Sequence, residues 1–197
     1  MRKKLVIAII SVAVLAAVFV GVTSYLSGGE REGKNEAQSP KDFKNTTYTI
    51  EGSAVTLVGG VAETEVAPGS ASKTVTRYFG NEVRSDLNGD GREDAVFLLT
   101  QEAGGSGTFF YAVAAIDTGN GYAGSQGFLL GDRIAPQTTE LSRNPRHKNV
   151  IVVNYAVRAP GEPMTARPSV GKSVWLKLDP QTMQFGEVVQ NFEGESK

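Results

Sequence analysis

One stretch organises the predicted fold: Asp86-Leu87-Asn88-Gly89-Asp90-Gly91-Arg92-Glu93-Asp94-Ala95-Val96-Phe97-Leu98-Leu99-Thr100. In its first part, an oxygen-bearing side chain recurs at every second position before a glycine forces a turn. Its second part is a continuous apolar run, which predicts a strand that is buried on both faces of a sheet. The sequence therefore predicts an acidic loop that leads directly into a central strand. The run Thr108 to Ile116 is its expected antiparallel neighbour, with Val96, Leu98 and Phe110 among the most buried residues.

The acidic loop has the pattern of a calcium site. Calcium takes about six to eight oxygen ligands in a flexible shell, and alternate residues of a tight loop can converge on one point. We expect side-chain oxygens from Asp86, Asn88 and Asp90, the backbone carbonyl of Arg92, and one or two oxygens from Asp94. Calcium is therefore the predicted cofactor, and these five residues are its predicted ligands.

The spacing of the acids separates this loop from an EF-hand. The EF-hand pattern requires a bidentate Glu at its twelfth position, and here that position is Phe97. An acid at the ninth position, followed at once by a strand, resembles the calcium loops of FG-GAP repeats, the hairpin blades of integrin-type propellers. Propellers need about four or more blades, so a chain of 197 residues with one such loop is not a propeller.

A plain hairpin turn is the alternative for the acidic loop. Asn88-Gly89 and Asp90-Gly91 both favour the positive φ that tight hairpin turns require. However, the carboxylates of the three predicted acidic ligands repel one another when no cation is present, and a plain turn would function equally well with Ser, Thr or Lys at those positions. The pattern favours metal binding.

Composition limits the other classes of function. The chain has 40% hydrophobic residues and a formal net charge of −1, which allows one sizeable core and an appendage. It has no basic excess of the kind that indicates nucleic-acid binding. It also has no cysteine, which excludes disulfides, thiolate nucleophiles and cysteine zinc sites.

The N-terminal residues 1–26 predict a membrane anchor or a signal peptide. Met1-Arg2-Lys3-Lys4 precedes a mostly apolar stretch, Leu5 to Val22, which reaches the length needed to span a bilayer as a helix. We favour an uncleaved single-pass anchor over cleavage after a small residue such as Ser24. In both cases the basic cluster keeps the N-terminus cytoplasmic, so the rest of the chain is extracytoplasmic, and secreted if the segment is cleaved.

The rest of the chain predicts a polar linker, a β domain and a short tail. Residues 27–45 are almost without large apolar side chains and read as a disordered linker. Residues 46–190 contain short β-prone runs separated by glycine-rich turns, and no apolar period of 3.6. We therefore expect an all-β domain of about ten strands, as a sandwich or small barrel, followed by a tail at 191–197.

Besides the acidic loop, four stretches of the β domain form a recognisable set: Ala67 to Ala71, Gly105 to Tyr111, Gly131 to Gln137 and Arg167 to Val170. Together these stretches look like a family of uncharacterised bacterial envelope proteins that is sometimes associated with META-like domains. This resemblance supports a location in the cell envelope and a coherent fold, but it implies no activity.

Two classes of function follow from these features. The favoured class is a membrane-anchored extracytoplasmic module that binds calcium and an envelope ligand or protein partner, without nucleic acid. The alternative is an envelope hydrolase with its site in a cleft between sheets. The phosphate-loop-like run Ala166 to Ser173 lacks a following helix, and His147, the one histidine, lies in a polar connector.

Overall fold

The computed structural model describes residues 42–189, and within this range it confirms the predicted all-β class. The described residues form twelve strands and one short 3-10 helix, where about ten strands were expected. In chain order the elements are η1 (Phe43–Asn45), β1 (Thr47–Ile50), β2 (Ser53–Thr56), β3 (Val61–Glu65), β4 (Lys73–Ser85), β5 (Asp94–Glu102), β6 (Phe109–Asp117), β7 (Tyr122–Gly124), β8 (Phe128–Asp132), β9 (Ala135–Leu141), β10 (Val150–Val157), β11 (Val170–Asp179) and β12 (Gln184–Glu187).

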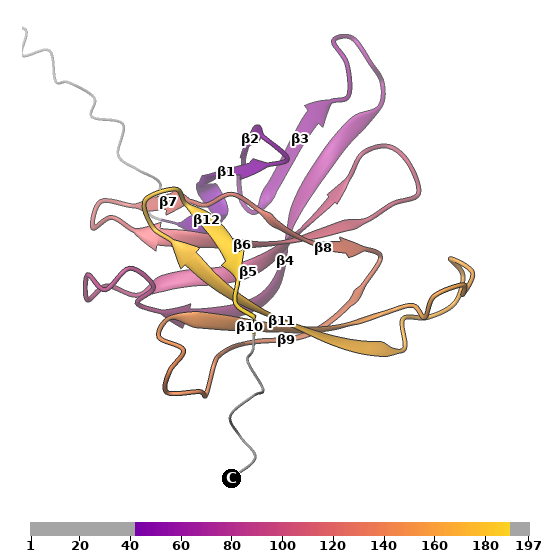
Figure 1. Ribbon diagram of the computed structural model, residues 1–197. Coiled ribbons are helices and arrows are strands. Elements are labelled where there is room, and N and C mark those ends of the chain that lie inside the picture. The colour runs from indigo at the N-terminus through magenta and orange to yellow at the C-terminus, as the bar shows by residue number, and fades with distance from the viewer. Residues whose placement is uncertain (1–41, 190–197) are drawn as a thin grey trace, which may run out of the picture. The chain divides into compact units, whose positions relative to one another are not determined.

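The strands form two sheets and a separate hairpin (Figure 1). The larger sheet has six strands in the order β3-β4-β5-β6-β7, with β8 also pairing with β6. The smaller sheet has four strands in the order β12-β11-β10-β9. All pairings between the named strands are antiparallel, and β1 and β2 form the hairpin. Because β7 has only three residues, it carries too little pattern to be recognised in the sequence.

Strand β5 is the centre of the packing, as its continuous apolar run predicted. It pairs with β6 in the register Val96↔Ala114 and Leu98↔Ala112, and Val96, Leu98 and Phe110 are 1%, 0% and 6% exposed, so the expected pairing and burial are both confirmed. Each fully buried side chain of this size stabilises the fold by about 1.5–3 kcal/mol.

The alternation of side chains along β5 divides the apolar residues between two clusters. Val96 and Leu98 face the smaller sheet, where they pack with residues such as Ile151 and Leu176. Ala95, Phe97 and Leu99 face the opposite side, together with the β1–β2 hairpin and η1. The described domain is therefore layered, with β5 buried on both faces because a different element covers each face.

The hairpin and η1 close the outer face of the larger sheet. Tyr48 and Ile50 of β1 are almost fully buried there, and Phe43 of η1 stacks 5.1 Å from the Phe97 ring. Phe43 is thus part of the core, so the folded domain includes Asp42 to Asn45, which the sequence assigned to the linker. The predicted segment 1–26, the linker up to residue 41 and the tail 191–197 lie outside the described residues. No helix within residues 42–189 has the length and apolarity to cross a membrane.

Gly80-Asn81 has the composition of a turn but does not reverse the chain. Strand β4 continues through it and pairs with β5 on both sides, from Tyr78↔Leu99 to Val83↔Val96. Gly80 and Asn81 have φ of 115° and 51°, which marks a β-bulge. The bulge bends the strand that ends at the acidic loop.

Candidate metal loop

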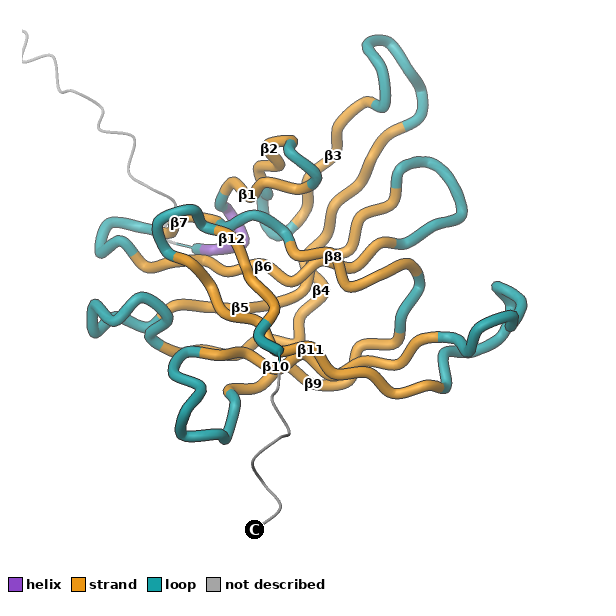
Figure 2. The backbone as a smooth tube through the Cα atoms, in the orientation of Figure 1, coloured by secondary structure: helices purple, strands orange, loops and turns teal. Residues whose placement is uncertain are grey.

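The acidic loop connects β4 to β5 at one end of the larger sheet. Asp86, Asn88, Asp90 and Arg92 lie in the connection, and Asp94 is the first residue of β5. Figures 1 and 2 show this loop at the same end of the molecule as the β6–β7 and β9–β10 connections. The predicted residues therefore occupy a rim formed by three loops.

The carboxylate of Asp86 is the centre around which the loop turns. Its Oδ1 accepts hydrogen bonds from the backbone N–H groups of Gly89 at 2.6 Å and Asp90 at 3.2 Å, and its Oδ2 accepts one from Gly91 at 2.9 Å. Gly89 and Gly91 have φ of 86° and 84°, a conformation in which other residues are strained. The glycines thus allow the chain to wrap around one carboxylate.

Asp90 lies at the exposed part of the loop and bonds to its neighbours. Its Oδ1 accepts the N–H of Arg92 at 2.8 Å, while its Oδ2 accepts the Nδ2 of Asn88 at 2.9 Å and forms an ion pair with the Arg92 guanidinium. The backbone N–H of Arg92, followed by the Asn88 amide, lowers the pKa of Asp90. Asp90 is therefore a stable anion with a cation already beside it.

Asp94 differs from the other acids because it is fully buried. Its Oδ2 accepts the N–H of Leu87 at 2.8 Å, and its Oδ1 accepts the N–H of Asp117 at 2.8 Å. Burial raises the pKa of Asp94 and outweighs these two hydrogen bonds, and the negative charges of Asp90 and Asp86 raise it further. The loop thus brings three carboxylates close enough to repel one another.

The oxygen donors are of the type that calcium prefers, but they are not gathered around one point. Within residues 42–189, no group of three or more His, Cys, Asp or Glu side chains is arranged to hold a metal ion. The hydrogen bonds show where two of the carboxylates point instead: Asp90 toward Arg92, and Asp94 toward Leu87 and Asp117. Each carboxylate oxygen can accept a second partner, so the residues fit calcium in their chemistry but would have to rearrange to enclose it.

Two contributors to this region were missed in the sequence. The Arg92 Nε donates to the Asp117 carbonyl at 2.9 Å, and the Asn149 Nδ2 donates to the Leu87 carbonyl at 3.0 Å. Asp117 begins the turn-prone run Asp117 to Gly121, which was visible in the sequence as a turn but gave no sign of its contact with the acidic loop. The neighbouring loops therefore hold both ends of the acidic segment.

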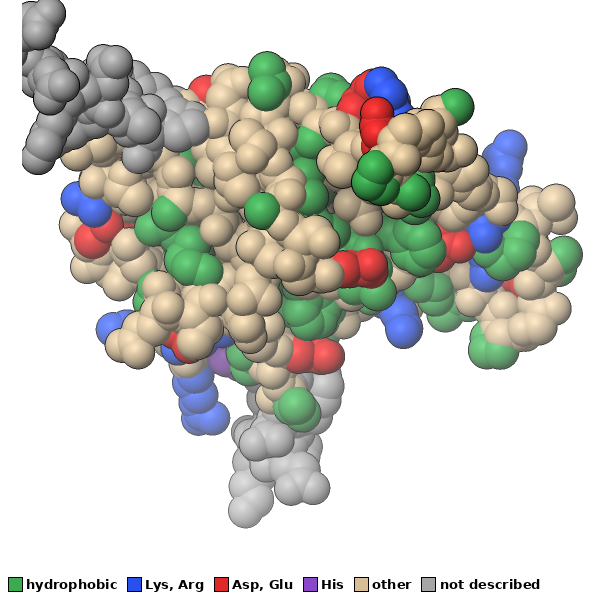
Figure 3. Space-filling view, turned by 90° about the horizontal axis from the view of Figure 1, so that it is seen from above, with side chains coloured by type: hydrophobic (Ala, Val, Ile, Leu, Met, Phe, Trp, Pro, Cys, Tyr) green, Lys and Arg blue, Asp and Glu red, His purple; other side chains and the backbone are tan. Residues whose placement is uncertain are grey.

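The β9–β10 connection is basic. Arg143, Arg146 and Lys148 are exposed, and Figure 3 shows Lys and Arg side chains close to the histidine. The His147 Nδ1 lies 3.1 Å from the Ser142 Oγ, which fixes the ring within its own loop. As the sequence indicated, this is a solvated connector, and it contributes to the acidic loop only through its last residue, Asn149.

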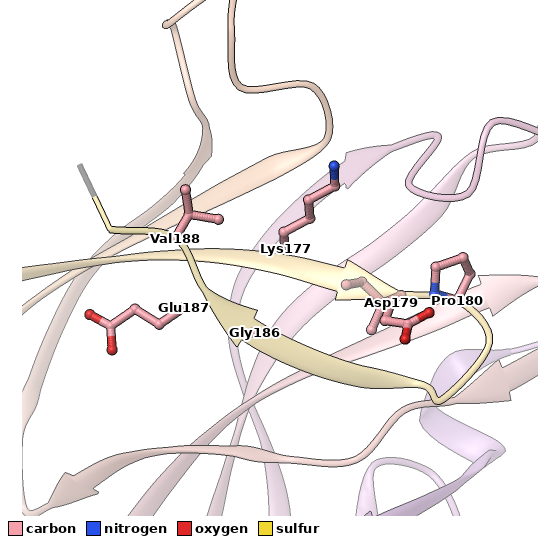
Figure 4. Close-up of a pocket in the computed structure, with 7 residues that line it drawn as sticks. Lys177, Asp179, Pro180, Gly186, Glu187 and Val188 are labelled. Carbon is pink, nitrogen blue, oxygen red and sulfur yellow. The ribbon is translucent and has the colours of Figure 1, made fainter. Parts of the chain in front are cut away.

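A shallow apolar groove of about 400 Å³ crosses the paired strands β11 and β12 (Figure 4). Lys177 and Val188 point to the same side of these strands, and Gly186 between them adds no side chain. The Asp179 carboxylate accepts hydrogen bonds from the Gln181 N–H and the Thr182 hydroxyl, which lower its pKa. This acid therefore caps its own turn.

Comparison with known proteins adds no family to these observations: no family model, no curated protein and no solved structure matches the chain.

Proposed function

We propose that this chain is a membrane-anchored extracytoplasmic β domain that binds calcium at the acidic loop and acts as a binding or interaction module. One observation carries the proposal. Asp86, Asp90 and Asp94 are held in one tight loop, which three backbone hydrogen bonds wrap around the Asp86 carboxylate. Burial raises the pKa of Asp94, and repulsion from the negative charges of Asp90 and Asp86 raises it further. A divalent cation would relieve this repulsion.

The expected ligands are the side-chain oxygens of Asp86, Asn88, Asp90 and Asp94 and the backbone carbonyl of Arg92. Binding requires Asp90 to leave the Arg92 guanidinium, which is 44% exposed and has a second partner in the Asp117 carbonyl. Asp86 keeps the loop closed through its three backbone hydrogen bonds while this exchange takes place. Calcium would supply the positive charge that fixes the loop in one shape.

The test is thermal unfolding of the full-length chain in detergent with calcium and with chelator. A ligand that binds only the folded state adds about 1.4 kcal/mol to the free energy of unfolding at ten times its Kd, and about 2.7 kcal/mol at a hundred times. Extracellular modules bind calcium at about 0.1–1 mM. The melting temperature should therefore rise by several degrees in millimolar calcium, and much less in magnesium.

Two neighbouring acids provide the matched control for this test. Asp90→Ala should abolish the calcium response. Glu93→Ala should keep it, because the Glu93 side chain is 64% exposed and lies 3.7 Å from Arg84, outside the ligand set. Equal melting curves with calcium and with chelator in the unmodified chain would show that the loop is an acidic hairpin only.

The location is tested separately from the metal. Protease added outside intact cells should remove the β domain, because the predicted linker before residue 42 is polar and the basic residues 2–4 keep the N-terminus inside. A domain that is protected in intact cells and cleaved only after lysis would contradict an extracytoplasmic location. A mature N-terminus near Tyr25 would replace the anchor with a signal peptide.

A further inference from the structure

A second region, at the end of strands β4 and β5 opposite the acidic loop, has the features of a small-molecule site. The tip of the β1–β2 hairpin overhangs strands β3, β4 and β5, and a cavity of about 240 Å³ lies beneath it. Its walls include the apolar residues Ile50 and Val55 and the polar residues Glu51, Thr64, Thr74 and Gln101. The cavity is large enough for a molecule the size of a monosaccharide.

Glu51 is held at the cavity in an unfavourable backbone conformation. It is the first of the two central residues of the hairpin turn, with φ of 49°, a position at which Asn, Asp or Gly is preferred. Its Oε1 accepts a hydrogen bond from the hydroxyl of the buried Tyr111 at 2.8 Å. Strained residues that the surrounding structure holds in place occur often at ligand sites, and here the hydrogen bond from Tyr111 holds the carboxylate of a residue that lines the cavity.

The charges around the cavity favour a cationic ligand. No Lys or Arg lines the cavity, and the two cations of the neighbouring part of β4, Lys73 and Arg77, alternate with Thr74 and therefore point to the opposite face of the sheet. On that face they pair with Glu63 at 2.7 Å and Glu102 at 3.4 Å. The cavity is therefore lined by one negatively charged side chain, Glu51, and by no positively charged one.

The uncharged groups of the cavity present hydrogen-bond acceptors. The Gln101 Nε2 donates to the buried Thr76 Oγ1 at 3.1 Å, which leaves the Gln101 Oε1 available. Within residues 42–189, neither this oxygen, nor the Glu51 Oε2, nor the Thr74 hydroxyl has a hydrogen-bond partner. A primary ammonium group carries three N–H donors and one positive charge, which match a carboxylate with neighbouring neutral acceptors.

We propose that this cavity binds small molecules that carry a primary ammonium group, with Glu51 as the counter-ion and Gln101 and Thr74 as acceptors. The carbon body of the ligand packs against Ile50 and Val55. Amino sugars and ethanolamine headgroups both have this chemistry. The cavity shares no lining residue with the acidic loop, so the test of the ammonium site does not depend on the result for calcium.

The experiment compares n-butylammonium with n-butanol, which has nearly the same shape but no charge. In NMR titrations of the full-length chain in detergent micelles, butylammonium should shift the side-chain amide signals of Gln101 and the backbone signals of Glu51 and Thr74 with a millimolar Kd. Butanol should cause no saturable change in the positions of these signals. Equal responses to the two probes, or no response to butylammonium, would overturn the proposal.

Three variants assign the effect to the cavity. Glu51→Gln keeps the shape and the acceptor for Tyr111 but removes the charge, and it should weaken butylammonium binding about tenfold. Thr74→Val should weaken it about threefold, and Glu63→Gln, which removes a carboxylate from the opposite face, should leave it unchanged. Equal losses in Glu51→Gln and Glu63→Gln would mean general charge attraction and would reject the site.

Once the cavity is established, the source of the ammonium group is identified by parallel titrations with glucosamine and O-phosphoethanolamine. The probe that binds with the lower Kd indicates whether the ammonium group belongs to an amino sugar or to a lipid headgroup. Unchanged melting temperatures of the variants show that each loss of binding comes from the site and not from unfolding.

Discussion

Asp90 and Asp94 stand four residues apart in the same loop and have opposite environments. Asp90 is exposed, and hydrogen bonds from Arg92 and Asn88 lower its pKa. Asp94 is fully buried, and burial raises its pKa although two backbone N–H groups bond to it. The outer part of the loop is thus held by side chains that can exchange partners, whereas its inner end is fixed to the body of the domain.

This difference assigns separate tasks to the two acids. Asp94 joins the acidic loop to the end of β6, because one of its oxygens accepts the N–H of Leu87 and the other accepts the N–H of Asp117. Among residues 42–189, the Asp90 carboxylate bonds only to Asn88 and Arg92. Asp94 should therefore matter for folding with or without calcium, while Asp90 should matter only when calcium is present.

The largest expected effect is the loss of stability in Asp94→Ala. The substitution leaves the buried N–H of Leu87 and the partly buried N–H of Asp117 without their acceptor, at about 1–3 kcal/mol each. Chemical denaturation in chelator should therefore show a free energy of unfolding lower by about 2–6 kcal/mol. Asp94→Asn, which keeps one acceptor, should fall between this variant and the unmodified chain.

Asp90→Ala is the control that tests the comparison itself. In chelator it should change the free energy of unfolding little, since its partners Asn88 and Arg92 can turn to water. If Asp90→Ala and Asp94→Ala were equally destabilised without calcium, the division between an exchangeable and a fixed part of the loop would be wrong.

The same comparison shows what the sequence could predict. The continuous apolar run from Ala95 and the glycine-rich turn after it are local signals, and they were sufficient for the β5–β6 pair and its burial. The spacing of the acids was sufficient to select Asp86 to Asp94 as a loop of interest. The spacing predicted the same role, calcium ligation, for all three acids of the ligand set, because spacing alone carries no information about burial.

The features that the sequence did not reveal depend on distant residues. The partner of Asp94 is the N–H of Asp117, 23 positions away, and any residue except proline supplies such a group. Gly80-Asn81 has the local preference of a turn, but pairing with β5 on both sides converts it into a bulge. Glu51 in a left-handed conformation runs against local preference and is stabilised by a hydrogen bond from Tyr111, in a strand far along the chain.

The next effect is a dependence of calcium stabilisation on pH. Folding raises the pKa of Asp94 above its ordinary value of 3.8. Without calcium, the contribution of Asp94 to the free energy of unfolding therefore decreases as the pH rises from this ordinary pKa through the raised pKa of the folded state. Calcium needs the charged form, so the stability difference between calcium and chelator should be complete above the raised pKa and shrink below it. Denaturation curves from about pH 7 to about pH 4 measure this difference.

Glu93→Ala should give the same pH profile as the unmodified chain, because its side chain is exposed and paired with Arg84. A calcium contribution that stayed constant over this range would mean that Asp94 does not ligate the ion and serves only as the fixed inner end of the loop.

The smallest expected effect concerns Arg92, whose guanidinium forms an ion pair with Asp90 and donates to the Asp117 carbonyl. Arg92→Ala keeps the backbone carbonyl that is the predicted ligand and removes the competing cation. Because an exposed ion pair is weak, calcium should bind about two- to fivefold more tightly, as measured by calorimetry. Arg143→Ala removes the same charge from a side chain that is 92% exposed in the β9–β10 connection, and it should have no such effect. Weaker binding in Arg92→Ala alone would mean that the guanidinium shapes the loop for calcium instead of competing with it, and the outer part of the loop would then be as fixed as its inner end.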